Sequence, residues 1–416
     1  MRSVATGARA AVFVLPTSAA GQQGPVAGWL STAGWASAAA RVLGASWIVT
    51  PEGVLDPASA RERGSRPDLA PPGRTALTRR VPTVVKTAVK DLRSARRARA
   101  FRVAPDGPWR ASDLAFVWQR HELFHTAGIR LARELGVPAV LFVPAPHVWE
   151  ARRWGVRRPG WERLAERRGE GRALRAADLV CAGTEAVAQE CVRIGADPGR
   201  IVVTPTGVDL ECFRPRADGG PVRARLGLGG RFVVGWVGSF RRFHALGLVL
   251  DALAGLPGAA LLLVGDGPER AAVEAEARRR AVEVVATGTV PHAVLPEYLA
   301  AMDVALVVAA RDETFHYSPL KLAEYLAAGL AVVAPDVPQL RARLRHGADA
   351  LLVPPGDAAA LAGALRELHR DGALRARLAA AARRAAEAEW SWDRVVRRVD
   401  EELALRARTD GGRRGG

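Results

Sequence analysis

The chain has 416 residues, and because a domain typically takes about 150, its length predicts two sizeable domains. Apolar residues make up 49% and charged residues 25%, which excludes a largely disordered chain. The three cysteines show no C-x-x-C spacing, which excludes a disulfide framework and a cysteine-rich zinc module. The cysteine usage fits a reducing compartment, so we expect a cytoplasmic protein. No run of about 18 apolar residues occurs, so we expect no membrane-spanning helix.

The net charge of +17 is concentrated in two windows of the first half. Residues 61–110 carry a net charge of +10 and residues 151–175 a net charge of +6. Within the first window, apolar residues from Val81 to Leu92 recur at helical spacing, with Lys86 and Lys90 placed elsewhere around the helix. Such a basic amphipathic helix predicts peripheral contact with an anionic membrane at its inner face, and an ordinary surface helix is the alternative. No nucleic-acid-binding module is recognisable, so we expect no nucleic-acid partner.

Short apolar runs in the first half alternate with helical patterns. The expected strands are residues 11–16, 47–50, 114–118, 139–143, 179–182 and 201–204, with helices at 126–135 and 184–193 among them. This alternation predicts an N-terminal Rossmann-like domain over residues 1–205. Residues 206–230 are rich in Gly and Pro, lack periodicity and are expected to form a linker.

The second half shows the same alternation more regularly. The expected strands are residues 232–237, 260–264, 282–286, 304–308, 331–334 and 350–353, and the expected helices are 268–280, 295–301, 319–328 and 358–369. Because these strands lack polar alternation, they predict a parallel sheet covered on both faces, a doubly wound domain over residues 231–372. Residues 373–407 are expected to be helical and to pack back on the N-terminal domain, and residues 408–416 to form a loose tail.

A ligand site is expected where the strands of the second domain end. These ends are Gly238-Ser239-Phe240-Arg241-Arg242, Gly265-Asp266-Gly267-Pro268, Thr287-Gly288 and residues 311–318. Ligands of open parallel sheets bind outside the carboxyl ends of the strands, where helix N-termini and loop amides converge. Glycine at three of these ends permits the close approach of a ligand to the backbone.

The helix after residue 318 has the clearest terminal signals. Ser318 is a candidate N-cap, Pro319 fits the first helical position, and Gly329 is a good left-handed terminator. The amides of this N-terminus would attract phosphate, Lys321 adds a mobile charge, and Glu324 suits sugar hydroxyls. Arg241 and Arg242 are expected to contact the negative charge of the phosphates. Together these residues predict a site for a nucleoside diphosphate.

A set of motifs occurs together along the chain. The second half contains Val237-Gly238-Ser239, Val264-Gly265-Asp266-Gly267-Pro268, Thr287-Gly288 and Ser318-Pro319-Leu320-Lys321-Leu322-Ala323-Glu324, preceded by Pro205-Thr206-Gly207-Val208-Asp209 and, upstream, by Arg120-His121-Glu122-Leu123-Phe124. This set resembles family 4 glycosyltransferases. The resemblance implies an α/β GT-B fold, two facing Rossmann-like doubly wound domains with a cleft between them.

The same resemblance implies an enzyme, a retaining and metal-independent glycosyltransferase of the hexosyltransferase class. It would move a sugar from a nucleotide-diphosphate sugar, its co-substrate, to a glycan, a lipid-linked acceptor or a small molecule, without any other cofactor. The implied donor-binding residues are Gly238, Ser239, Arg242, Gly265, Asp266, Gly288, Ser318, Pro319, Leu320 and Glu324, and those expected to act in catalysis are Arg241, Lys321 and His316. Gly24, His121 and His147 are expected on the acceptor side.

The sequence departs from the family pattern at three places. The second Glu that the family has eight residues before Glu324 is His316, the usual Arg and Lys of the first donor loop fall on Ser239 and His244, and Pro144 stands where a catalytic His or Asn is common. These departures motivate the alternative of a degenerate GT-B protein that binds a nucleotide sugar or a partner without turnover.

A second alternative comes from His121-Glu122-Leu123-Phe124-His125, a literal H-E-x-x-H match. On a helix this spacing places two zinc-binding histidines on one face, with the Glu as general base of a metalloprotease. Against it, Leu131 stands where the extended motif has a third His. We therefore expect no metal site. Arginines, Lys321 and helix amides are expected to stabilise the leaving diphosphate instead.

Overall fold

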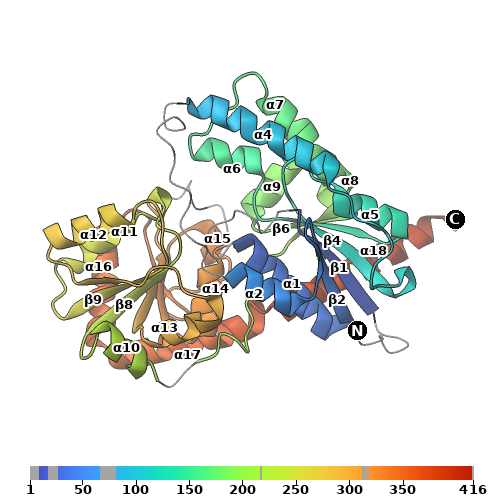
Figure 1. The fold of residues 1–416 in the computed structure, drawn as a ribbon. Helices are drawn as coiled ribbons and strands as arrows, with labels where there is room; N and C mark the ends of the chain where they lie inside the picture. The colour runs from blue at the N-terminus through green and yellow to red at the C-terminus, as the bar shows by residue number, and fades with distance from the viewer. Residues whose placement is uncertain are drawn as a thin grey trace. The chain divides into compact units, whose positions relative to one another are not determined.

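The computed structural model describes residues 9–16, 27–65, 81–215, 218–311, 315 and 318–414. The chain divides into two compact units (Figure 1). The first unit comprises residues 1–64, 68–207 and 392–416, and the second is formed mainly by residues 208–391. No helix in the described ranges is both long enough and apolar enough to cross a lipid bilayer.

In the described residues, the first unit is built on a seven-stranded sheet of order β3-β2-β1-β4-β5-β6-β7. Its strands are β1 (Arg9–Val14), β2 (Gly44–Thr50), β3 (Gly53–Leu55), β4 (Leu114–Arg120), β5 (Ala139–Val143), β6 (Leu179–Ala182) and β7 (Ile201–Val203). All neighbouring pairs are parallel except β2 and β3. The predicted parallel sheet is therefore present, with an added antiparallel edge strand.

Helices cover this sheet and connect its strands. They are α1 (Ala27–Leu43), α2 (Pro57–Ser65), α4 (Thr83–Ala100), α5 (Ala127–Leu135), α6 (His147–Arg153), α7 (Glu162–Leu164), α8 (Gly171–Ala176), α9 (Glu185–Ile194) and α18 (Trp392–Arg414), with a π-helical turn, η2 (Ala165–Glu170). α18 joins the first unit at the end of the chain. It also includes residues 408–414, which were expected to form a loose tail.

An aromatic cluster fixes α18 in the first unit. The ring of Trp392 lies 5.7 Å from that of Trp35 on α1, and Trp35 in turn contacts Trp118 and Phe142 of the sheet at 5.6 Å each. α1 passes so close to α18 that a Cβ atom at Gly34 would overlap the Trp392 indole. Burial of several large rings, each contributing about 1.5 to 3 kcal/mol, explains why the last helix packs here.

The second unit contains, in its described part, a six-stranded parallel sheet of order β10-β9-β8-β11-β12-β13. The strands are β8 (Phe232–Val237), β9 (Ala259–Val264), β10 (Val284–Ala286), β11 (Val304–Leu306), β12 (Ala331–Pro335) and β13 (Leu351–Val353). The helices are α10 (Gly220–Leu226), α11 (Leu246–Leu253), α12 (Arg270–Arg279), α13 (Leu295–Ala300), α14 (Leu320–Ala327), α15 (Pro338–Arg341), α16 (Ala358–Arg370) and α17 (Gly372–Glu389). This is the doubly wound arrangement predicted from the unbroken apolar strands.

Two expected boundaries differ from the structure. The segment expected as a linker, residues 206–230, contributes α10 and the buried side chains of Val222 and Leu228 to the core of the second unit. A helix of seven residues is too short to show a clear period in the sequence. The helical segment 373–407 is also divided, because α17 belongs to the second unit and only the part from Trp392 onward belongs to the first.

Candidate functional site

The glycine-bearing ends of β8, β9 and β10 lie together, as the strand order requires. The amide of Gly265 donates to the carbonyl of Gly288 at 2.9 Å, and the amide of Phe240 donates to the carbonyl of Asp266 at 3.1 Å. Gly238 and Gly265 both have positive φ, of 149° and 131°. A Cβ atom at Gly265 would overlap the carbonyl oxygen of Gly238. Glycine is therefore required here for the loops to pack on one another, independently of any ligand.

The helix expected to face a phosphate group starts one residue later than predicted. α14 begins at Leu320, and Pro319, with φ −71° and ψ 124°, stands at the N-cap without a side-chain cap. The Pro319 carbonyl accepts from the amide of Leu322 at 3.1 Å, so the assignments of Ser318 as N-cap and Pro319 as first helical residue are both wrong by one position. At the other end Gly329 has φ 68°, as its predicted terminator role requires.

A tyrosine joins α14 to the end of β8. The hydroxyl of Tyr325 accepts from the amide of Val237 at 2.7 Å, and the Tyr325 side chain is buried. The desolvation of this hydroxyl raises its pKa well above the usual value. α14 is thus held beside the end of β8 by its second turn, a contact that the sequence motif did not predict.

Lys321 projects from α14 onto this first loop. Its Nζ atom lies 4.0 Å from the centre of the Trp236 ring, a cation–π contact, and a Cβ atom at Gly238 would come within 2.8 Å of it. Burial lowers the pKa of Lys321 to about 7, although the nearby Glu324 carboxylate opposes the shift. A cation poised to titrate near neutral pH therefore lies at the end of β8.

His244, at the place of the family lysine, is a buried neutral group. Its Nδ1 lies 2.5 Å from the carbonyl oxygen of Ser239, and its ring packs edge-on against Trp236 at 5.1 Å. Burial lowers its pKa to about 3, and the cations of Lys321 and Arg241 add to the shift. Arg241 and Arg242 are exposed on the same loop. The charge of this loop therefore comes from Lys321 and the two arginines.

Glu324 lies in the second turn of α14, where its side chain is only 4% exposed. Its Oε1 atom accepts from Nε2 of His292 at 2.7 Å. His292 belongs to η5 (His292–Val294), a short 3-10 turn after β10. The sequence analysis missed this partner. The sequence feature that could have indicated it is a histidine directly after Pro291, in a segment that follows a strand of the same sheet.

Asp266 shapes its own loop. Its Oδ1 accepts from the amide of Gly267 at 2.7 Å, and its Oδ2 pairs with Arg270 at 3.1 Å. Two of the expected site residues, His316 and Gly24, lie outside the described residues. The structure thus brings together Gly238, Ser239, Gly265, Gly288 and Lys321, with Glu324 one turn deeper in α14.

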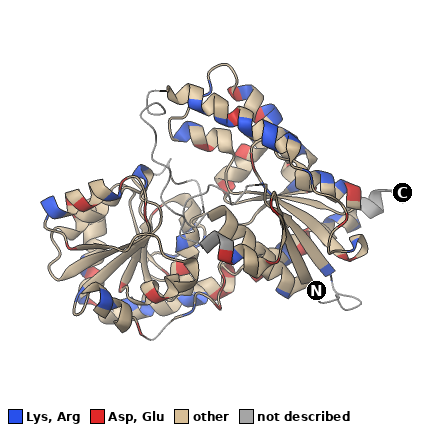
Figure 2. Cartoon of the chain, viewed as in Figure 1, with Lys and Arg blue, Asp and Glu red and all other residues tan. Residues whose placement is uncertain are grey.

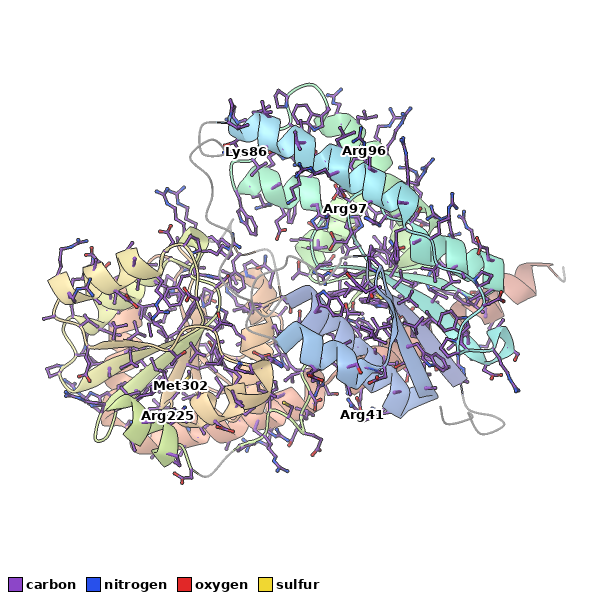
Figure 3. All side chains as sticks on the ribbon, viewed as in Figure 1. Arg41, Lys86, Arg96, Arg97, Arg225 and Met302 are labelled. Carbon is purple, nitrogen blue, oxygen red and sulfur yellow. The ribbon has the colours of Figure 1, made fainter. Side chains whose placement is uncertain are left out.

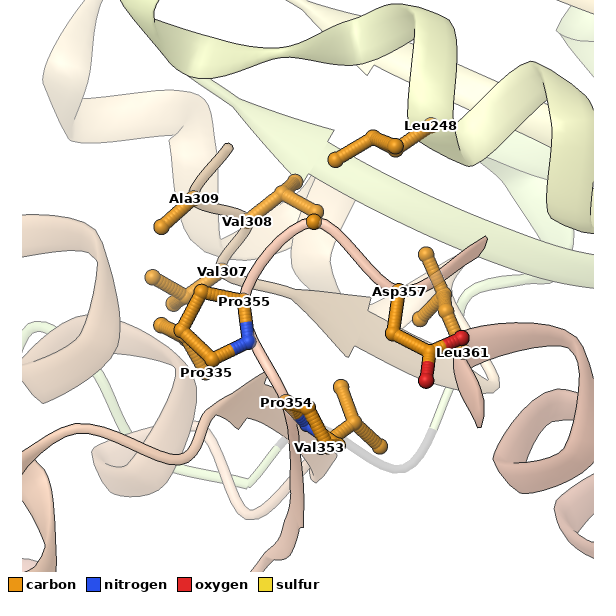
Figure 4. Close-up of a pocket in the computed structure, with 11 residues that line it drawn as sticks. Leu248, Val307, Val308, Ala309, Pro335, Val353, Pro354, Pro355, Asp357 and Leu361 are labelled. Carbon is orange, nitrogen blue, oxygen red and sulfur yellow. The ribbon is translucent and has the colours of Figure 1, made fainter. Parts of the chain in front are cut away.

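A small pocket opens at the carboxyl ends of β11, β12 and β13 (Figure 4). Its lining is aliphatic and proline-rich, and includes Val307, Pro335, Pro354 and Pro355. The one carboxylate in the lining, Asp357, caps α16 by accepting from the amide of Ala360 at 2.8 Å. None of the expected donor residues lines this pocket, so it is distinct from the site around Lys321.

The first unit has a separate polar cluster where β4 and β5 end. Nε2 of His147 lies 3.3 Å from Oε2 of Glu122, and Nε of Arg120 lies 3.9 Å from the other oxygen of that carboxylate. Burial would raise the pKa of Glu122, but His147 and Arg120 outweigh it and lower the pKa to about 2. Burial would lower the pKa of His147, but Glu122 outweighs it and raises the pKa to about 9. This pair is therefore charged at neutral pH.

The H-E-x-x-H segment does not have the helical geometry that zinc binding requires. Residues 121–126 form a turn, and Phe124 has φ 74°, which is incompatible with a continuous helix. His121 is directed to Glu170 at 3.3 Å, while Glu122 pairs with His147. The metalloprotease alternative is therefore wrong in its structural premise.

Comparison with known proteins identifies the family. The sequence model described as Glycosyl transferases group 1 matches residues 231–371, and that described as Glycosyltransferase Family 4 matches residues 48–212. A D-inositol 3-phosphate glycosyltransferase 1 of Catenulispora acidiphila is 32% identical over 323 residues, which cover 72% of this chain and 74% of the relative. The chain belongs to the family 4, group 1 glycosyltransferases.

Two further comparisons report proteins to which this glycosyltransferase family member is similar in sequence or in fold. A 2-deoxystreptamine N-acetyl-D-glucosaminyltransferase of Streptomyces fradiae is 34% identical over 196 residues, 44% of each chain. The crystal structure of Anabaena HepE in complex with UDP and glucose superimposes with a TM-score of 0.66 at 18% identity, covering 95% of this chain and 100% of HepE. The GT-B fold expected from the motifs is thereby confirmed. This chain spans about half the length of several of the curated relatives that it matches.

Proposed function

We propose that this protein transfers a sugar, with retention and without a metal ion, from a nucleotide-diphosphate sugar to an acceptor. The observation that carries the proposal is the convergence of Lys321, the N-terminus of α14 and the glycine loop at Gly238 on the end of β8. A lysine, exposed arginines and helix amides together supply positive charge and directed donors. These are the groups that a departing diphosphate requires.

Each residue has a role that follows from its chemistry. Lys321, Arg241 and Arg242 would hold the diphosphate together with the amides of Leu320 and Lys321, and Ser239 would donate a hydroxyl. The backbone at Gly238, Gly265 and Gly288 would contact the nucleotide, while Glu324 would accept from ribose hydroxyls and His316 would contact the donor sugar. Charge that grows on the leaving diphosphate is stabilised by cations already in place, so the interaction strengthens in the transition state.

A donor screen tests this function. Purified protein is incubated with UDP-, GDP- and ADP-sugars together with 2-deoxystreptamine or D-inositol 3-phosphate as acceptor, and the release of nucleoside diphosphate is measured in the presence and absence of EDTA. Turnover with one donor that EDTA leaves unchanged supports the proposal. Tight binding of a donor without turnover supports the degenerate GT-B alternative, and absence of both binding and turnover would refute the proposal.

The acceptor is proposed to bind on the side of the first unit, near His121 and His147; Gly24, also expected on the acceptor side, lies outside the described residues. The charged pair of Glu122 and His147 is 27% and 32% exposed at the side chains, so it can hydrogen-bond to a polyhydroxylated ligand. Relatives named for 2-deoxystreptamine and D-inositol 3-phosphate make these two compounds the first acceptors to test. His147→Gln is expected to raise the acceptor KM and to leave the donor KM unchanged.

We also propose peripheral binding to an anionic membrane, at its cytoplasmic face, through α4. This helix is fixed to the first unit by the buried carboxylate of Asp91, which pairs with Nε of Arg158 at 2.7 Å and accepts from Trp161 at 3.0 Å. Its remaining faces are exposed. One presents aliphatic side chains that are 36% to 54% exposed, namely Val84, Val85, Val89 and Leu92.

The exposed residues of α4 also include six basic ones, visible as blue bands on this helix in Figure 2, namely Lys86, Lys90, Arg93, Arg96, Arg97 and Arg99. Figure 3 labels Lys86, Arg96 and Arg97 on this helix. The one acidic residue of α4 is the buried Asp91, so its exposed faces combine apolar and positive side chains. This combination suits insertion at the headgroup level of an anionic bilayer, where each basic residue contributes about 1 kcal/mol.

Liposome sedimentation tests the membrane proposal. Binding to vesicles that contain phosphatidylglycerol, but not to pure phosphatidylcholine, is expected. Lys86→Glu with Lys90→Glu should abolish the binding, whereas the matched charge reversal Arg278→Glu with Arg279→Glu on α12 should leave it unchanged. Equal loss in both double variants would show that only net charge matters, and would refute a role specific to α4.

A further inference from the structure

The proposed roles do not yet explain the contact between His292 and the buried carboxylate of Glu324 in the second unit. Its atoms are 2.7 Å apart, and the two side chains are only 13% and 4% exposed. They come from different elements, η5 and α14, which lie 32 residues apart in sequence. The pair therefore depends on the folded sheet and not on local sequence.

The geometry limits what His292 can do. In this contact the imidazole Nε2 of His292 is the donor and the carboxylate oxygen of Glu324 is the acceptor. The ring of Phe213 packs against the imidazole at a centroid distance of 5.1 Å, and Phe213 is itself buried. The imidazole is thus wedged between an aromatic ring and the carboxylate. This packing fixes the position of the imidazole, which contacts Glu324 directly.

Occupation of one carboxylate oxygen has a consequence for the other. A glutamate side chain has three rotatable bonds, and a free carboxylate would sample several orientations. With Oε1 held by His292, the second oxygen is restricted to a narrow range of directions. A carboxylate fixed in this way accepts from a ligand hydroxyl without a further loss of side-chain freedom when the ligand binds.

We infer that His292 is a positioning residue, which orients Glu324 toward the ribose hydroxyls of the bound nucleotide. The inference rests on the proposed role of Glu324 in the donor site. His292 touches neither the diphosphate nor the reacting bond in this scheme. Its removal therefore weakens the part of the affinity that depends on ribose hydroxyls, and leaves the part that depends on the diphosphate.

The test compares two probes, UDP and 2′,3′-dideoxy-UDP, by calorimetry on the full chain. Wild-type protein is expected to prefer UDP. In His292→Leu, which keeps the bulk and removes the donor, UDP affinity should fall about tenfold while dideoxy-UDP affinity stays within a factor of two. In Glu324→Gln the preference for UDP should also be lost, and the double variant should be no worse than Glu324→Gln alone.

A second pair of variants keeps the test decisive if His292→Leu does not fold. A glutamine amide places its nitrogen close to the position of Nε2, whereas an asparagine amide falls short of it. His292→Gln should therefore keep the preference for UDP, and His292→Asn should lose it. Both replacements are polar, so a difference between them reports how far the donor nitrogen extends from the backbone and not a change in the polarity of the site.

The outcomes separate this inference from the function on which it rests. If His292 variants lose affinity for both probes equally, His292 acts only in folding and the inference is overturned while the nucleotide site stands. If wild-type protein binds the two probes equally, Glu324 does not contact ribose, and the inference falls but the diphosphate site stands. If wild-type protein binds none of UDP, GDP and ADP, the proposed function fails together with the inference.

Discussion

The lowered pKa of Lys321 predicts that donor affinity falls as the pH rises above neutrality. Burial against Trp236 brings the pKa of this lysine to about 7 in the free protein. A diphosphate beside Nζ favours the charged form, so binding raises the pKa and takes up a proton. The contribution of Lys321 is therefore almost fully present at about pH 6, one unit below this pKa, and is lost as the pH rises through the pKa of the free protein.

The size of the effect follows from the pKa alone. If only the charged lysine binds the donor, the apparent dissociation constant is multiplied by one plus the ratio of neutral to charged lysine. At pH 6 this factor is about 1.1 and at pH 8 it is about 11. We expect affinity at pH 8 to be about tenfold weaker than at pH 6, with uptake of about 0.9 proton for each donor bound at pH 8.

Calorimetric titration with an intact UDP-sugar measures both quantities. The two phosphates of a nucleotide sugar do not titrate between pH 6 and 8, and His244, with a pKa of about 3, stays neutral. Repeating the titration in buffers of different ionisation enthalpy gives the number of protons taken up. Lys321→Arg is the control, because a guanidinium stays charged throughout.

The result that would refute this reasoning is specific. Equal wild-type affinity at pH 6 and pH 8 would show that Lys321 does not lie beside the diphosphate or does not titrate near 7. A pH dependence that persists unchanged in Lys321→Arg would assign it to another group.

Three further predictions concern single contacts. Arg241→Ala is expected to lower kcat about a hundredfold with an unchanged melting temperature, and unchanged turnover would remove Arg241 from the donor site. Arg158→Met leaves the buried carboxylate of Asp91 unpaired and should cost about 3 to 5 kcal/mol in urea unfolding, most of which an added Asp91→Leu should restore. Gly34→Ala places a Cβ atom against Trp392 and should destabilise the protein by about 1 to 3 kcal/mol, so full stability would contradict the close approach of α1 and α18.

The order of elements could be predicted from the sequence because the strands are buried on both faces. Runs such as residues 260–264 contain no polar alternation, and only a parallel sheet covered by helices buries them. The division of the last helical segment could not be predicted. The division depends on whether Trp390 and Trp392 pack in the same hydrophobic core. The structure places Trp390 in the core of the second unit, whereas Trp392 packs against Trp35 of the first unit.

The site could be predicted only at the level of strand ends. The position of the glycine loops could be predicted because ligands bind at the carboxyl ends of parallel strands. The end of the helix at Gly329 could be predicted because glycine readily adopts the left-handed conformation that terminates helices. The partners of these residues come from elsewhere in the chain. Tyr325 with Val237 and His292 with Glu324 depend on the order of strands in the sheet, which the sequence does not specify directly.

The departures from the family pattern do not by themselves indicate a loss of activity. A neutral His244 at the place of a family lysine would remove one cation from the first donor loop, which is the argument for a degenerate protein. Lys321, however, reaches the same loop from α14 and lies against Gly238, so it can supply the cation that the proposed donor site requires. A second charged lysine at position 244 would lie close to Lys321 and would oppose its protonation, since like charges disfavour one another. His244 and Lys321 are therefore best understood together, as one arrangement in which the cation comes from the helix. We expect His244→Lys to lower the pKa of Lys321 further and to weaken donor binding at pH 7, an outcome opposite to that expected if His244 were simply a lost cation.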